Sequence, residues 1–240
     1  SNLPKEVSQN IASLIFDTMG IYWTMKFPNE KDKELLYEWD LKSKKLPIKI
    51  FVPFGHYEKY LEKRIPVDKK FALDVSELNS EDWIITFGLD MINPVAVLIE
   101  RTLGGLKEKF GIKEIIENLE KDEKSSEEIK SAAVGLFEAA KTWGIFSEKG
   151  ENPTKINDLI SGGMTSVLDL SVYNSVGLFN VRALVISLVS RKIFNQRMEA
   201  RKKEEIMSLA KGFDFSSSEE KKETPLVWFF IDEAHEFLPL

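Results

Sequence analysis

Four apolar runs in the chain predict the strands of a parallel sheet. Residues 12–17 (ASLIFD) and 226–232 (LVWFFID) each run from apolar side chains into an Asp, and 165–170 (TSVLDL) carries Asp169 near its end. A further run, 47–55 (PIKIFVPFG), is stopped by Pro53 and Gly55. Continuous apolar runs of this length are typical of strands buried on both faces. We also read 68–78 and 82–88, less regular in pattern, as short or edge strands.

The apolar spacing becomes helical between residues 92 and 161. The segment 93–110 repeats apolar residues at helical intervals up to Gly104-Gly105, and 112–119 continues the pattern. Ser125 with Glu128 three residues later predicts a capping box for the next helix, and Asn152-Pro153 predicts a cap and a first-turn proline. We interpret 92–161 as a small helical bundle inserted into an α/β frame. The alternative, ordinary crossover helices, stays open.

The last third of the chain predicts a strand–helix–strand unit. Residues 181–205 form an amphipathic helical pattern that is apolar first and highly charged later, and 212–223 has the Ser-rich, charged composition of a loop. A long crossover between two strands implies a parallel, right-handed βαβ connection. The predicted fold class is therefore α/β with a mostly parallel sheet.

Composition narrows the function classes. The chain has 240 residues, 43% of them hydrophobic, which suffices for a large core. It has no Cys and two His, which excludes disulfides and thiolate metal sites. No apolar run approaches the ~20 residues needed to span a bilayer, so we expect a cytoplasmic protein with no membrane partner. The net charge of −6 excludes a general basic footprint for nucleic acid, and any such contact must be local.

The carboxylates that follow the last strand are the main candidates for chemistry. A strand running into Asp232 and Glu233 is what a nucleotide hydrolase needs, because Asp232 would bind Mg²⁺ and Glu233 would deprotonate the attacking water. The same pattern also fits an Asp that merely caps the next helix. The extension to IDEAHEFLP (231–239) makes the hydrolase interpretation more specific.

The segment FFIDEAHEFLP (229–239) resembles the Walker B motif of the HerA/FtsK-type ATPases, and especially the HerA-like ring-forming DNA translocases. LIFDTMGIYW (14–23) is similar to that family's second strand with its Asp-x-x-Gly-x-Tyr turn, here Asp17, Gly20 and Tyr22. TSVLDLS (165–171) and the helix after it resemble the elements that precede Walker B. The resemblance implies a partial RecA-like P-loop ATPase core with an inserted helical bundle, divided as 1–91, 92–161 and 162–240.

The resemblance also implies cofactors, partners and roles. ATP and Mg²⁺ would be bound, with Asp232 and Asp17 as cofactor-binding residues and Glu233 as the catalytic base. Double-stranded DNA would be the substrate of a homo-oligomer, a hexameric ring, with a nuclease as a further partner. His235 is a candidate for coupling hydrolysis to DNA, against the simpler interpretation of a helix-start His.

A basic run on the predicted long helix is a candidate DNA contact. Such a basic run usually forms a solvated helix face. Here, however, Lys202, Lys203 and Lys211 lead into the 206–223 segment, which we interpret as a candidate pore loop. The full run comprises Arg191, Lys192, Arg197, Arg201, Lys202 and Lys203.

One departure from the family is specific. P-loop ATPases hold phosphates with G-x-x-x-x-G-K-[ST], and no Gly-Lys pair occurs in these residues. We therefore expect the chain to correspond to the middle of a longer ATPase and to be inactive alone. Two alternatives remain: a DEAH-type superfamily 2 helicase fragment, which the EFLP extension and the inserted helices fit less well, and a degenerate ATPase-fold scaffold without enzymatic activity.

Overall fold

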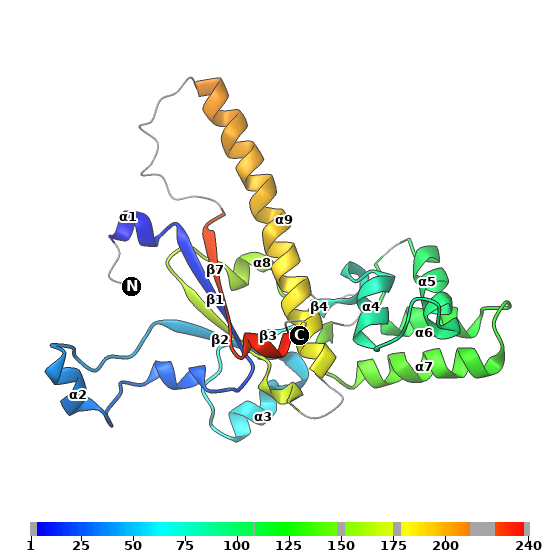
Figure 1. Cartoon of the computed structure of the whole chain (residues 1–240), viewed down its shortest axis with the longest axis horizontal. Helices are drawn as coiled ribbons and strands as arrows, with labels where there is room; N and C mark the ends of the chain where they lie inside the picture. Colours follow the sequence, from blue (N-terminus) through cyan, green and yellow to red (C-terminus); the bar gives the residue numbers. More distant parts are fainter. Residues whose placement is uncertain (1–3, 108, 148–151, 175–178, 212–223, 238–240) are drawn as a thin grey trace.

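The computed structural model describes residues 4–107, 109–147, 152–174, 179–211 and 224–237. Its centre is a parallel five-stranded sheet in the order β3-β2-β6-β1-β7 (Figure 1). The strands are β1 (Ile11–Asp17), β2 (Ile48–Pro53), β3 (Lys69–Phe71), β6 (Thr165–Asp169) and β7 (Leu226–Ile231). A second, two-stranded sheet pairs β4 (Leu73–Asp74) with β5 (Phe146–Ser147). The predicted α/β class with a mostly parallel sheet is confirmed.

Helices surround this sheet and extend from one side of it. The α-helices are α1 (Lys5–Ser8), α2 (Lys33–Glu38), α3 (Tyr57–Glu62), α4 (Ser80–Thr86), α5 (Pro94–Gly105), α6 (Ile112–Glu120), α7 (Glu127–Lys141), α8 (Ile156–Leu159) and α9 (Phe179–Lys211). Short 3₁₀ segments are η1 (Tyr22–Lys26), η2 (Phe54–His56), η3 (Val75–Glu77), η4 (Ser171–Tyr173) and η6 (Ala234–Phe237). In Figure 1, α4 to α7 gather to the right of the sheet, and the 33-residue α9 projects far beyond it.

Alternation along the central strands creates two apolar layers. In β1, Leu14 and Phe16 belong to the larger cluster and Ile15 to the smaller one on the opposite face. Because successive side chains of a strand point to opposite faces, a continuous apolar run can serve both layers. The larger layer contains the first half of α9, through residues such as Leu184 and Leu188. The smaller layer packs under α3 and η1, through Tyr60 and Tyr22.

Helices α4 and α7 and strand β5 meet at an aromatic cluster. Trp83 is fully buried, with its ring centroid 4.9 Å from that of Phe137 and 5.1 Å from that of Phe146. These rings join α4 and α7 to β5. The mostly helical character of 92–161 agrees with its sequence pattern, although this range also contains β5, which pairs with β4. The predicted domain boundaries at 91/92 and 161/162 stay a prediction.

Three local predictions were wrong. Residues 82–88, read as a strand, belong mostly to α4, because the Asn79 side chain and Asp82 form a capping box that starts a helix there. Helix α7 is capped by Ser126, one residue after the predicted cap, since Ser125 instead accepts a hydrogen bond from Arg101. Asn152-Pro153 starts no helix: α8 begins at Ile156 without a side-chain cap.

The last strand also differs from its prediction. We expected a buried strand, but β7 lies at the edge of the described sheet, paired with β1 alone. Its large side chains are half-exposed, from Ile231 at 37% to Trp228 at 53%. A continuous apolar run shows that a strand suits a buried position, but it does not show which described neighbours cover it.

No helix in the described ranges combines the length and apolar composition needed to cross a membrane.

Candidate functional site

The candidate site lies where three neighbouring parallel strands end. Asp17 ends β1 opposite Asp169 of β6, and Phe16 pairs with Ile231 of β7, which places Asp232 one residue further along. The carboxyl ends of parallel strands are where open α/β sheets bind ligands. The structure therefore brings Asp17, Asp169 and Asp232 to the same edge, although each comes from a distant part of the sequence.

Asp17 is fully buried and holds a tight turn. Its Oδ1 accepts hydrogen bonds from the backbone N–H of Gly20 at 2.7 Å and of Ile21 at 3.3 Å, and its Oδ2 accepts one from Tyr22 at 2.9 Å. Burial raises the pKa of Asp17 above its ordinary value, the neighbouring Asp169 raises it further, and the backbone hydrogen bonds partly oppose both. Both oxygens are thus occupied in building the turn, which favours a positioning role over direct contact with a cofactor.

Gly20 allows this turn to sit against β6. Its φ of +71° lies in the left-handed region, and a Cβ there would meet the Ser171 side chain at 2.4 Å. Ser171 is itself held, because its hydroxyl and its backbone N–H both donate to Asp169 Oδ1, at 2.7 and 2.9 Å. The glycine of the Asp-x-x-Gly spacing singled out in the sequence is therefore required by the close contact between the turn after β1 and Ser171 of η4, directly beyond β6.

The Asp232 segment is tied to β1 by backbone contacts. The N–H of Asp232 donates to Phe16 O at 3.1 Å, and the buried Thr18 hydroxyl donates to Asp232 O at 3.3 Å. Asp232 Oδ2 is buried and accepts no hydrogen bond from any described residue. A buried carboxylate oxygen without a donor is costly unless a cation or donor reaches it.

Glu233 adopts an uncommon backbone conformation. Its φ of +50° is left-handed, which costs a non-glycine residue about 1–2 kcal/mol. Its side chain is partly exposed, with Oε2 at 3.3 Å from His235 Nδ1. The two residues expected to act in hydrolysis and coupling are therefore in contact, and Glu233 directly follows Asp232 in the chain.

Tyr22 is a neighbour that the sequence did not single out for chemistry. Burial raises the pKa of its phenol, and the carboxylates of Asp232, Asp17 and Glu233 raise it further. The phenol thus lies within electrostatic range of all three carboxylates. In the sequence, the only indication of this role was the spacing of Tyr22 from Asp17, because the turn that brings Tyr22 to the carboxylates forms in the folded chain.

Asp232 could supply one protein ligand to a magnesium ion. No group of three or more His, Cys, Asp or Glu side chains in the part of the chain that the structure describes forms a complete metal site. Mg²⁺ in nucleotide hydrolases usually takes one or two carboxylates and completes its shell with phosphate oxygens and water. Asp232, with its unpartnered Oδ2, suits that role.

The predicted DNA-contacting residues lie far along α9. Lys202 and Lys203 are exposed and form no ion pair with a described residue. Lys211 ends the helix, and its side chain, like the predicted loop at 212–223, lies outside the described residues. The rest of the basic run is neutralised: Arg191 pairs with Asp82, Lys192 with Glu77, Arg197 with Glu204 and Arg201 with Glu205.

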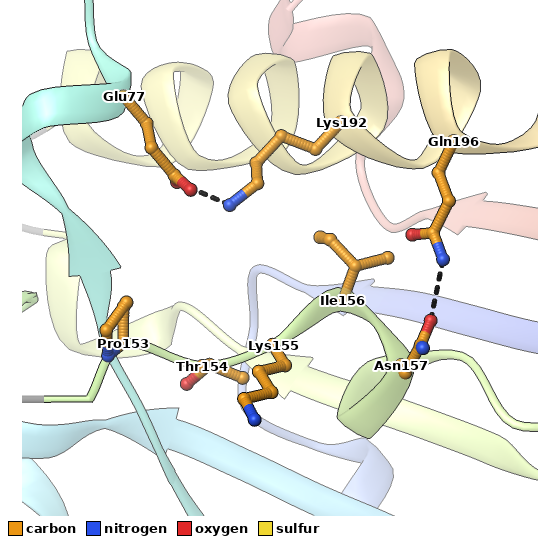
Figure 2. Close-up of a pocket in the computed structure, with 8 residues that line it drawn as sticks. All are labelled: Glu77, Pro153, Thr154, Lys155, Ile156, Asn157, Lys192 and Gln196. Carbon is orange, nitrogen blue, oxygen red and sulfur yellow. Dashed lines mark hydrogen bonds and ion pairs between the residues drawn. The ribbon is translucent and has the colours of Figure 1, made fainter. Parts of the chain in front are cut away.

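A hollow elsewhere on the surface is spanned by contacts between its own lining side chains. It measures about 310 Å³ and lies between α9, α8 and the residues before α8 (Figure 2). Lys192 pairs with Glu77 across it, and Gln196 donates to Asn157 at 2.7 Å. None of its lining residues belongs to the candidate site.

His56 has a structural contact away from the candidate site. Its Nε2 lies 3.2 Å from Trp143 O, and burial lowers its pKa.

No protein-family model matches this sequence, and no curated protein matches it either. The resemblance to the HerA/FtsK-type ATPases therefore stands on the motifs and their placement alone.

Proposed function

We propose that this chain carries the magnesium-binding and water-activating half of the catalytic site of a HerA-like ATP hydrolase that moves along double-stranded DNA. The observation that carries the proposal is the unpartnered, buried Oδ2 of Asp232 next to Glu233, at the carboxyl edge of a parallel sheet. A carboxylate that only capped the following segment would accept a hydrogen bond from its backbone.

The chemistry assigns separate tasks to neighbouring residues. Bound Mg²⁺–ATP would supply the electrophilic phosphorus and the neutralisation of its oxygens. Asp232 would hold the cation or one of its waters, and Glu233 would accept the proton of the attacking water. His235, 3.3 Å from the Glu233 carboxylate, would orient that base.

The contact with DNA and the ring belong to the same proposal. A parallel sheet with its site at one edge and a long helix that carries exposed lysines beyond the sheet fits an enzyme whose nucleotide and DNA sites are separate. In a homo-oligomeric, hexameric ring, each active site would be completed by a neighbouring subunit. Lys202, Lys203 and Lys211 would then face DNA phosphates, and a nuclease is the expected further partner.

A pair of substitutions tests the assignment in the complete gene product. Glu233→Gln keeps the size and hydrogen-bonding reach of the side chain but removes the base, so ATP turnover should fall at least about a hundredfold while ATP binding survives. Asp232→Asn should instead weaken Mg²⁺ dependence, raising the Mg²⁺ concentration needed for half-maximal turnover. Glu120→Gln, on the exposed end of α6, serves as the matched control and should change neither quantity.

The result that would overturn the proposal is equally specific. If Glu233→Gln hydrolysed ATP at the wild-type rate, Glu233 would not be the base. If the complete gene product neither bound nor hydrolysed ATP, an ATPase-fold interaction scaffold would replace the enzyme as the better account.

A further inference from the structure

A buried arginine of α9 contacts the segment that follows Glu233. Arg182 is 6% exposed. Its Nη2 lies 3.0 Å from Glu236 Oε2, its Nη1 donates to Asn174 Oδ1 at 2.9 Å, and its guanidinium lies over the ring of Phe237, 5.6 Å from the centroid. One side chain thus joins the first turn of α9, the residue after η4 and both final residues of η6.

The same segment carries the left-handed backbone of Glu233. Strained conformations persist only where the surroundings hold them. On the amino-terminal side, Thr18 donates to Asp232 O and Phe16 O accepts from Asp232 N–H. On the carboxyl-terminal side, Glu236 N–H donates to Glu233 O at 2.9 Å, and the Glu236 side chain is the one that Arg182 holds. The segment is therefore held at both ends, once from β1 and once from α9.

We propose that Arg182 is a positioning residue for Glu233: by holding η6 it fixes the left-handed backbone of Glu233, and with it the place of the Glu233 carboxylate. The catalytic part of this inference rests on the proposed function. The geometric part does not, because it concerns only how α9 holds residues 233–237.

Arg182 lies in the first turn of a long helix. The helix runs without interruption from Phe179 to Lys211, and its far end carries the exposed Lys202 and Lys203. Arginine suits the near end, because its planar fork can hold Asn174 and Glu236 at the same time, whereas a lysine offers one ammonium.

Substitution of Arg182 should leave the chain folded. Both of its polar partners are at least partly exposed, with the Glu236 side chain at 34%, so neither becomes a buried unpaired group. Arg191 offers a matched control. It is also an arginine of α9 held by a carboxylate, but its partner is Asp82 of α4, at 2.7 Å and away from η6.

Amide hydrogen exchange of this chain tests the geometric part. Arg182→Gln should speed exchange across residues 233–237 by about tenfold, as expected when a contact to a charged group is lost. Glu236→Gln should act on the same residues more weakly, and Arg191→Gln should leave them unchanged. Equal exchange at 233–237 in wild type and Arg182→Gln would overturn the inference. If circular dichroism showed that Arg182→Gln fails to fold, Arg182→Lys and Glu236→Gln would decide by the same measurement.

Turnover in the complete gene product tests the catalytic part. Arg182→Gln should lower kcat for ATP by about ten- to a hundredfold, because a misplaced base acts poorly, while KM changes by less than about twofold. Arg182→Lys should recover part of kcat. Faster exchange with an unchanged kcat would show that Arg182 orders η6 without positioning Glu233, and would refute the proposal. A gene product without ATP turnover would refute the proposed function, and the exchange result would still decide whether Arg182 holds the segment.

Discussion

Gly20→Ala probes whether the turn after β1 packs against β6 as closely as the structure shows. The substitution adds a Cβ at a φ of +71°, 2.4 Å from Ser171 Oγ and 2.8 Å from Ser171 Cβ. A left-handed backbone costs a non-glycine residue about 1–2 kcal/mol, and overpacking costs about 1–3 kcal/mol. Because Ser171 is held by Asp169, it cannot turn away without losing a hydrogen bond. We therefore expect the free energy of unfolding to fall by about 2–5 kcal/mol.

Two other glycines distinguish the cost of the left-handed backbone from the cost of overpacking. Gly88 also has a left-handed φ, +66°, but its nearest neighbouring atom would lie 3.9 Å from a Cβ, so Gly88→Ala should cost only the conformational part, about 1–2 kcal/mol. Gly135, within α7, has open space around it, and Gly135→Ala should stabilise by up to about 1 kcal/mol. Urea unfolding, followed by tryptophan fluorescence and circular dichroism, measures all three. Equal losses for Gly20→Ala and Gly88→Ala would refute the close approach of the turn to Ser171.

Three further predictions concern pH, nucleotide and DNA. Because the pKa of Asp17 in the folded state is raised above 3.8, its contribution to stability is complete below pH 3.8 and is lost as the pH rises through the folded-state pKa. In urea unfolding, the stability of wild type relative to Asp17→Asn should therefore fall as the pH rises from 3.8 through the folded-state pKa. A constant or growing difference would contradict the raised pKa. Isothermal titration of this chain with ATP and Mg²⁺ should show no micromolar site, since its sequence contains no Gly-Lys phosphate loop. In the complete gene product, replacing Lys202, Lys203 and Lys211 with Gln should lower DNA-stimulated ATP turnover and flatten its salt dependence, and unchanged stimulation would place the DNA contact elsewhere.

The motif residues were recognisable before the structure because their roles depend on short-range order. Asp17, Gly20 and Tyr22 lie within one turn, and Asp232 and Glu233 follow their strand directly, so their spacing along the chain sets their spacing in space. The turn nevertheless changes the expected role of Asp17. Its burial and its bonds to backbone N–H groups could not be read from the spacing, because they depend on how β6 and Ser171 close over the turn.

The basic run on α9 shows the opposite case. Its charges were visible in the sequence, but most of them are neutralised by carboxylates, and Asp82 and Glu77 lie more than a hundred positions away from their partners Arg191 and Lys192. Only the fold decides which lysines remain exposed. Arg182 carried no sequence signal at all, because its contact with Glu236 exists only after α9 returns the chain to the sheet.

The sequence by itself determined the α/β class, the long helix and the strands of the main sheet, including the short edge strand β3 within 68–78. Runs of apolar residues and their period are local properties, so they can be recognised without knowing the neighbours of a segment. The tertiary structure decided that β7 lies at the edge of the described sheet, that residues 82–88 belong to a helix, and that Asp17, Asp169 and Asp232 share one edge. Strand order and neighbours arise from contacts between segments far apart in the chain. The local pattern of any one segment holds no information about which partner covers it.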